Sequence, residues 1–131
     1  MKFLIISLLL SSSLIASDWL SFRGSQANIG RTIETISEQP KLQWKFSTGG
    51  PIKGTAVTQN DRVYIGSEDK KIYCLELKTG KLIWSKELGD IIESSPLCLE
   101  NDIVVGTANG ELYRLNGKTG QQLWIYKADD R

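Results

Sequence analysis

Short apolar runs in which every second residue is hydrophobic alternate with polar turns from residue 42 onward. A period of two predicts β-strands, because successive side chains of a strand point to opposite faces of a sheet. The turn residues support this, since Asn109-Gly110 favours a type I′ hairpin and Lys118-Thr119-Gly120 ends in a flexible glycine. In the second half of the chain the pattern predicts strands at residues 95–99, 102–106, 111–115 and 121–126.

The whole pattern occurs twice, at a spacing of 40 residues. Trp44, Trp84 and Trp124 mark the repeat, and residues 42–81 align with residues 82–121 without a gap. Four short antiparallel strands per ~40 residues are typical of a propeller blade. The sequence therefore predicts an all-β chain that holds about two four-stranded blades of a β-propeller, plus the outer strand of an earlier blade around Trp44. Ten of the 40 aligned positions are identical: Leu42/Leu82, Trp44/Trp84, Gly49/Gly89, Ile52/Ile92, Gly66/Gly106, Tyr73/Tyr113, Leu75/Leu115, Lys78/Lys118, Thr79/Thr119 and Gly80/Gly120.

The first seventeen residues differ from the rest of the chain. They combine Lys2, an apolar run from Phe3 to Leu10 and small residues before Asp18, which is the pattern of a secretory signal peptide. The apolar run is interrupted by three serines and is shorter than the ~20 residues of a bilayer span. We expect cleavage after Ser17 or Ala16, no membrane span in the mature chain, and a periplasmic or secreted protein. Residues 18–41 then form a segment that precedes the first blade.

Composition removes several function classes. The chain has 16 Lys plus Arg, 15 Asp plus Glu and no histidine. Balanced charge predicts no nucleic-acid partner, since such proteins carry clustered basic residues. The lack of histidine excludes Ser-His-Asp and Cys-His mechanisms and the usual zinc and haem ligand sets. The acidic and basic cluster Glu68-Asp69-Lys70-Lys71 occupies a turn position and is expected to be solvated.

Two segments resemble the tryptophan-docking motif A-x-D-x-x-T-G-K-x-x-W of the PQQ-like, or quinoprotein-type, propeller repeats. They are CLELKTGKLIW at residues 74–84 and RLNGKTGQQLW at residues 114–124. Both keep the Thr-Gly pair and the tryptophan, whereas Cys74 or Arg114 replaces the alanine and Glu76 or Asn116 replaces the aspartate. The opening DWLSFRGSQANIGRT, residues 18–32, is similar to the segment before the first blade in exported members. The resemblance implies that each indole lies over a turn of the adjacent blade.

The family that the chain resembles also includes quinone-dependent dehydrogenases. The resemblance implies that such an enzyme would use adjacent cysteines, calcium and a catalytic carboxylate. Cys74 and Cys98 are 24 residues apart, and no clustered acidic loop suits calcium. We therefore assign no catalytic, cofactor-binding or metal residue and expect no cofactor. The two cysteines fit either buried free thiols, which we favour, or a disulfide.

The function that this resemblance implies is that of a non-catalytic, BamB-like scaffold for protein partners in the cell envelope. Two alternatives remain open: the N-terminal piece of a PQQ-dependent dehydrogenase, and a sensor or carbohydrate-binding ectodomain. Propellers have 4 to 8 blades, so two repeats indicate an incomplete propeller, an N-terminal fragment whose remaining blades would follow residue 131.

Overall fold

The computed structural model describes residues 18–24, 27, 30–31 and 38–128. The expected signal peptide, residues 1–17, lies outside them. Within the described residues the chain forms eight β-strands and no helix, and none of these residues belongs to a helix that could cross a membrane. The strands are β1 (Val57–Gln59), β2 (Arg62–Gly66), β3 (Lys71–Glu76), β4 (Leu82–Glu87), β5 (Leu97–Leu99), β6 (Asp102–Gly106), β7 (Glu111–Asn116) and β8 (Gln122–Lys127).

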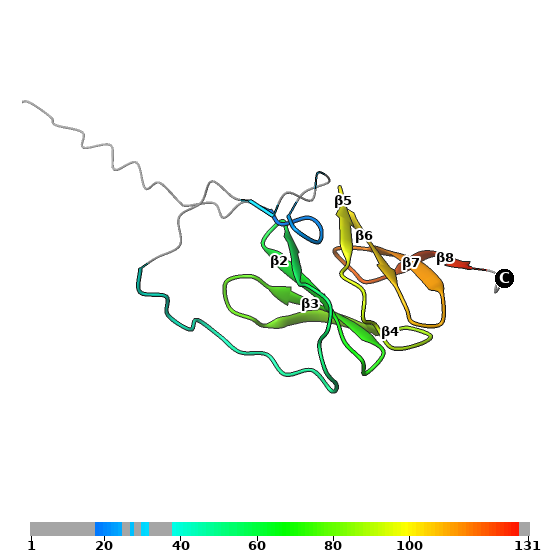
Figure 1. Cartoon of the computed structure of the whole chain (residues 1–131), viewed down its shortest axis with the longest axis horizontal. Helices are drawn as coiled ribbons and strands as arrows, with labels where there is room; N and C mark the ends of the chain where they lie inside the picture. The colour runs from blue at the N-terminus through cyan, green and yellow to red at the C-terminus, as the bar shows by residue number, and fades with distance from the viewer. Residues whose placement is uncertain (1–17, 25–26, 28–29, 32–37, 129–131) are drawn as a thin grey trace, which may run out of the picture.

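The strands form two separate four-stranded antiparallel sheets, in the orders β1-β2-β3-β4 and β5-β6-β7-β8 (Figure 1). The prediction of two consecutive sheets with a shift of 40 residues is confirmed. Both sheets carry the same irregularity, since the register shifts between Cys74 and Leu75 and again between Arg114 and Leu115. A bulge that recurs at one repeat position is a property of the repeat rather than a local defect.

The turn chemistry differs from the prediction at one hairpin. Only Gly110 has a positive φ in the Asn109-Gly110 turn, so this turn is not type I′. Its ends are joined by Gly110 N–H donating to Thr107 O and Thr107 N–H donating to Glu111 O, which spreads the turn over more than two residues. Positive φ at two successive residues occurs instead at Asn60 and Asp61, between β1 and β2.

Two layers of packed apolar side chains stabilise the sheets. The first lies between them and is lined by buried residues of both sheets and of the connection that joins them. Here Tyr64 and Cys74 of the first sheet face Ile103 and Tyr113 of the second. The other layer covers the opposite face of the first sheet, where Val63, Ile65, Tyr73 and Leu75 pack against the partly buried Trp44, Phe46 and Leu77.

Residues 42–47 resemble β4 and β8 in sequence but are not in a hydrogen-bonded strand. The expected outer strand around Trp44 is therefore wrong as a strand, because a strand needs a neighbour to pair with and the described residues supply none at this position.

The N-terminal segment reaches both sheets. Trp19 bridges Thr58 of β1 through two backbone hydrogen bonds, and Cys98 of β5 donates its N–H to Leu20 O. One extended stretch thereby ties together the first strands of the two sheets.

Candidate docking surface of the second sheet

One row of side chains crosses each sheet at the same repeat positions. In the first sheet the register pairs Val57 with Tyr64, Tyr64 with Cys74, and Cys74 with Trp84. Val57, Tyr64 and Cys74 are 0%, 2% and 0% exposed, because the second sheet covers them. Side chains that are paired across neighbouring strands lie on the same face of a sheet, so such a row runs across one face from the first strand to the last.

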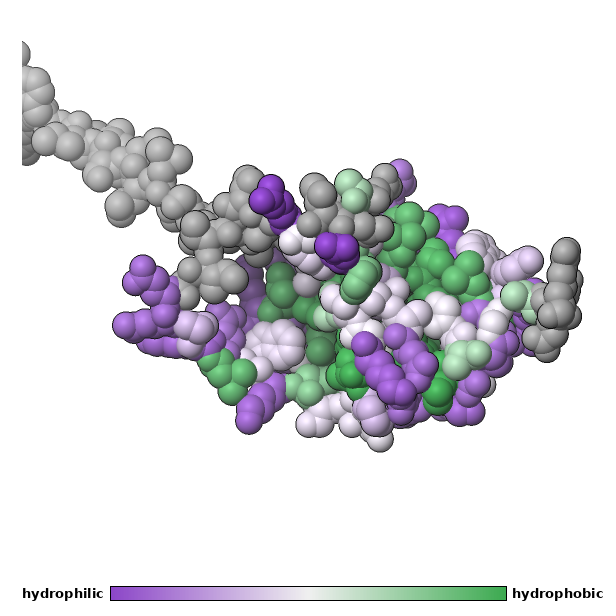
Figure 2. All heavy atoms as spheres, viewed as in Figure 1, coloured by the Kyte–Doolittle hydropathy of each residue, from purple (hydrophilic) through white to green (hydrophobic). Residues whose placement is uncertain are grey.

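The corresponding row of the second sheet is Leu97, Val104, Arg114 and Trp124, which we call the open row. Leu97 is 36% and Trp124 is 39% exposed. The neighbouring Leu112 and Tyr126, themselves a cross-strand pair, are 37% and 61% exposed. Figure 2 shows apolar side chains gathered over the second sheet. Neighbouring exposed apolar side chains of this kind are typical of surfaces that bind a protein, a membrane or a ligand.

The two upstream tryptophans show how the repeat uses an indole. Trp44 Nε1 donates to Leu77 O at 2.9 Å, and a Cβ built on Gly80 would lie 2.5 Å from the Trp44 ring. Trp84 Nε1 donates to Gly117 O at 3.1 Å, and a Cβ on Gly120 would lie 2.7 Å from its ring. Gly80 and Gly120 also have positive φ. Glycine is required there twice over, by the backbone conformation and by the ring that lies on it. The docking role predicted for Trp84 is confirmed.

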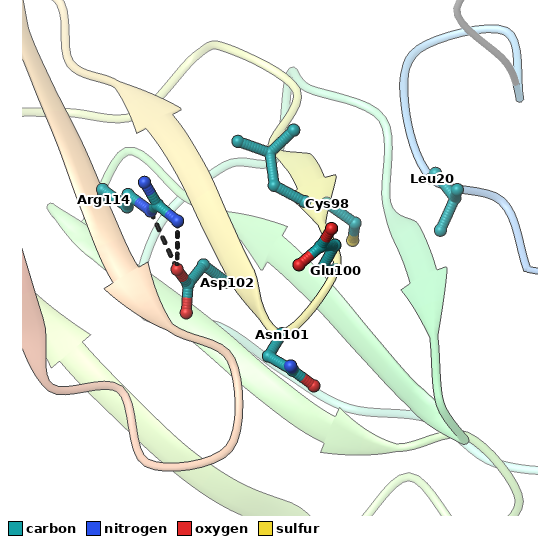
Figure 3. Close-up of a pocket in the computed structure, with 7 residues that line it drawn as sticks. Leu20, Cys98, Glu100, Asn101, Asp102 and Arg114 are labelled. Carbon is teal, nitrogen blue, oxygen red and sulfur yellow. Dashed lines mark hydrogen bonds and ion pairs between the residues drawn. The ribbon is translucent and has the colours of Figure 1, made fainter.

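A groove of about 640 Å³ adjoins the open row. Figure 3 shows it between Leu20 of the N-terminal segment and the β5–β6 turn, with Arg114 and Asp102 on its other side. Arg114 Nε and Nη2 lie 2.8 and 2.6 Å from Asp102 Oδ2. This pair orients the guanidinium and leaves the Arg114 side chain 40% exposed. The sequence did not predict the Arg114–Asp102 pair, because Asp102 is a diagonal neighbour of Arg114 on the adjacent strand and the register between β6 and β7 has to be known to bring the two together.

Carboxylates near the turns carry structural hydrogen bonds. In the second sheet Glu111 lies 2.7 Å from Lys127 Nζ and accepts from Tyr113 OH at 2.6 Å, and both contacts lower the pKa of Glu111. In the first sheet Asp69 accepts from Tyr73 OH and from the N–H groups of Lys71 and Gly49. Burial works against ionisation of Asp69, but these hydrogen bonds outweigh it and lower its pKa.

The cluster Glu68-Asp69-Lys70-Lys71 is therefore less solvated than expected. Besides the bonds of Asp69, Lys53 Nζ lies 2.6 Å from both Glu68 Oε1 and Glu93 Oε1. These contacts raise the pKa of Lys53, led by its hydrogen bond with Glu68. The prediction of a solvated turn is confirmed in part: Lys70 is exposed, whereas Glu68, Asp69 and Lys71 are half-buried because connections distant in sequence, at residues 49–53 and 93, pack beside the turn.

Cys74 and Cys98 are buried free thiols in the layer between the sheets. Burial raises the pKa of Cys74 to about 11 and that of Cys98 to about 12. Such thiols are protonated at neutral pH and react slowly. Among the residues that the structure describes, no group of three or more acidic or cysteine side chains is placed to hold a metal ion.

Comparison with known proteins agrees with this architecture. The profile of a family described as "Outer membrane protein assembly factor BamB" matches residues 30–131. The chain belongs to this family. No curated protein sequence matches the chain.

Solved structures place the chain within larger propellers. BamB from Moraxella catarrhalis matches with a TM-score of 0.63 and 23% identity, over 68% of this chain and 28% of that one. Quinohemoprotein alcohol dehydrogenase ADHIIG from Pseudomonas putida HK5 matches with a TM-score of 0.75 and 20% identity, over 87% of this chain and 19% of that one. The enzyme of the same class from Comamonas testosteroni matches with a TM-score of 0.70 and 16% identity, over 84% and 19%.

The chain thus spans less than a third of the length of these proteins. The two sheets of this BamB-family chain correspond to a portion of their propellers, and the predicted fold class is confirmed. At these identities the likeness shows the fold and not the activity.

Proposed function

We propose that this chain belongs to a non-catalytic scaffold that holds protein partners in the cell envelope, periplasmic or secreted, as BamB-like proteins do. The observation that carries the proposal is the match of residues 30–131 to the family described as an outer membrane protein assembly factor. The surface supports it, since the groove and the open row, with its exposed Leu97 and Trp124, lie side by side on the second sheet.

The groove has features that suit an extended protein segment. The edge of β5 already takes such a segment, because Cys98 N–H donates to Leu20 O. Beyond Leu20 the groove offers the turn residues Glu100 and Asn101 and the Arg114–Asp102 pair. Strand edges give affinity through the main chain, and nearby side chains give selectivity. We therefore place a partner contact at this end of β5.

Site-specific photo-crosslinking in a Gram-negative host tests the proposal. A benzoylphenylalanine introduced at Asn101, in the groove, should give discrete adducts with envelope proteins. The same group at Lys81, an exposed residue outside the groove, is the control and should give none. The protein's own export is read from the mass of its N-terminus, expected to begin at Asp18 or Ser17. Equal adducts from both positions, or none from Asn101, would contradict the proposed contact.

The alternative of a quinoprotein dehydrogenase has support from the two quinohemoprotein alcohol dehydrogenases with TM-scores of 0.70 and 0.75. Calorimetric titration of the chain with pyrroloquinoline quinone and Ca²⁺ tests whether this portion itself binds either ligand. We expect no saturable binding. Micromolar binding together with alcohol oxidation would establish the enzyme instead.

A further inference from the structure

Residues 18–20, which we call the strap, lie between the first strands of the two sheets. Trp19 N–H donates to Thr58 O at 3.0 Å and to Thr58 Oγ1 at 2.9 Å, and Thr58 N–H donates to Trp19 O at 2.8 Å. The next carbonyl is used by the other sheet, since Leu20 O accepts the N–H of Cys98 at 2.8 Å. Thr58 and Cys98 are the middle residues of β1 and β5 and are 40 positions apart. The strap therefore binds the same repeat position twice, through main-chain groups that any extended peptide has.

Each side chain of the strap has a place of its own. Asp18 Oδ1 accepts the N–H of Asn60 at 3.1 Å, just beyond the end of β1. The ring of Trp19 covers Gly24, where an added Cβ would lie 2.8 Å from it. Leu20 packs against the apolar layer between the sheets. An acidic, an aromatic and an apolar residue in succession therefore fit this position.

The strap is held less firmly than the strands beside it. It pairs with β1 through the isolated bridge between Trp19 and Thr58, whereas β1 pairs with β2 at three successive positions. Segments with few backbone hydrogen bonds open locally at a lower free-energy cost than strands inside a sheet. The strap is nevertheless part of the same chain, and a tethered ligand has an effective concentration of about millimolar. It therefore excludes a free peptide of equal affinity that is present at micromolar concentration.

We propose that the inner edges of β1 and β5 form a peptide-binding site, that the strap is its ligand in the resting chain, and that an extended protein segment of the same acidic-aromatic-apolar pattern displaces it. The site is built from the N–H groups of Thr58, Asn60 and Cys98, and the inference does not depend on the proposed envelope function. Figure 3 shows Leu20 at the start of the groove that continues along the β5–β6 turn. A displacing segment longer than the strap gains further contacts there.

Peptide binding to strap variants of the chain tests this proposal. The probe is a fluorescein-labelled heptapeptide with the sequence of residues 18–24, followed by fluorescence anisotropy. Trp19→Pro with Leu20→Asp releases the strap, because proline has no N–H for Thr58 and a carboxylate is costly in the apolar layer. Trp19→Phe with Leu20→Ile is the control and keeps the N–H, an aromatic ring and an apolar side chain. The released variant should bind the probe at least about 10-fold more tightly than wild type, and the control variant should behave as wild type.

A change on the edge itself shows where the probe binds. The N–H of Thr58 faces the strap rather than β2, so proline is tolerated there as on other edge strands. Added to the released variant, Thr58→Pro should weaken probe binding about 10-fold, whereas Thr58→Val keeps the N–H and should change it less. Circular dichroism checks each fold, and Trp19→Pro alone replaces the released variant if that variant unfolds.

Four outcomes would overturn the proposal. They are equal probe binding by wild type and the released variant, no binding by the released variant, equal binding of a probe with the same residues in scrambled order, and binding that Thr58→Pro leaves unchanged.

Discussion

The two sheets have the same strand order, register and bulge, yet their equivalent rows of side chains differ in burial. Val57, Tyr64 and Cys74 of the first sheet are buried, whereas Leu97, Val104 and Arg114 at the same repeat positions are not. The row of Val57, Tyr64 and Cys74 faces the second sheet, and the open row faces no other strand among the described residues. Burial in this protein is therefore set by the neighbouring repeat, as expected when each repeat contacts mainly the next.

The largest expected difference between the sheets concerns their tryptophans. Trp84→Ala should lower the free energy of unfolding by about 3 kcal/mol, because it removes a docked indole and its hydrogen bond to Gly117 O. Trp124→Ala, the matched change on the open row, should cost less than about 1 kcal/mol. Urea unfolding of both variants measures this. Equal losses would mean that Trp124 is also docked in solution.

The two strand-end glycines sharpen the comparison. A Cβ on Gly66 would lie 2.2 Å from Ile92 Cγ2, whereas a Cβ on Gly106 has its nearest neighbour at 3.7 Å. Gly66→Ala should therefore destabilise the protein by about 1–3 kcal/mol through overpacking.

Gly106→Ala is the control at the equivalent position of the open sheet. It should be neutral or stabilise the protein by up to about 1 kcal/mol, since alanine restricts the unfolded chain more than glycine does. Thermal melts of the pair decide the matter. Destabilisation by both variants would show that the open sheet is covered.

A smaller difference lies in the turn between the second and third strands of each sheet. Lys70, with φ 67°, occupies the left-handed position that Gly110, with φ 79°, holds in the second sheet. Lys70→Gly should stabilise the protein by about 0.5–1 kcal/mol, because glycine adopts a positive φ without strain. The gain is reduced slightly by the loss of the weak ion pair between Lys70 Nζ and Asp90 Oδ1, which are 3.4 Å apart. Gly110→Lys should cost about 1 kcal/mol. Chemical denaturation should show opposite signs, and the same sign for both exchanges would contradict this account.

The smallest effect is a shared dependence on acid. The pKa values of Asp69 in the first sheet and Glu111 in the second are both lowered on folding. A lowered pKa means that the unfolded state binds more protons, so this stability is present above the ordinary carboxyl pKa near ~4 and is lost as pH falls below it. Asp69→Asn and Glu111→Gln should each flatten the fall in unfolding free energy between neutral and acid pH. An unchanged pH profile in both variants would exclude these groups as its source.

Much of the architecture was predictable from local pattern. Strand period and the 40-residue repeat placed β6 at residues 102–106 as observed, and β5 and β8 within two residues at their starts. Trp84 was correctly expected to lie over a turn of the next repeat. These features depend on residues that are close in sequence or that repeat at a fixed spacing, so a single sequence predicts them.

Other features required contacts that no local pattern encodes. The Asn109-Gly110 turn was predicted as type I′ from its dipeptide, but Thr107 and Glu111 bond across it and select another geometry. The acidic turn at Glu68 and Asp69 was expected to be hydrated, yet Lys53 and Gly49 of a separate connection bind it. The sequence did not predict the open row, because the register between the strands decides which of its residues are neighbours on one face.

By itself the sequence determined the strands, their order within each repeat and the glycines on which the tryptophans lie, because these follow from side-chain periodicity and from turns that only glycine fits. The tertiary structure decided how far each tryptophan is covered: Trp44 and Trp84 lie on the turns at Gly80 and Gly120, whereas Trp124 is 39% exposed among the described residues. Trp44, Trp84 and Trp124 occupy equivalent positions of the 40-residue repeat, and burial is a property of what packs against a residue rather than of the residue.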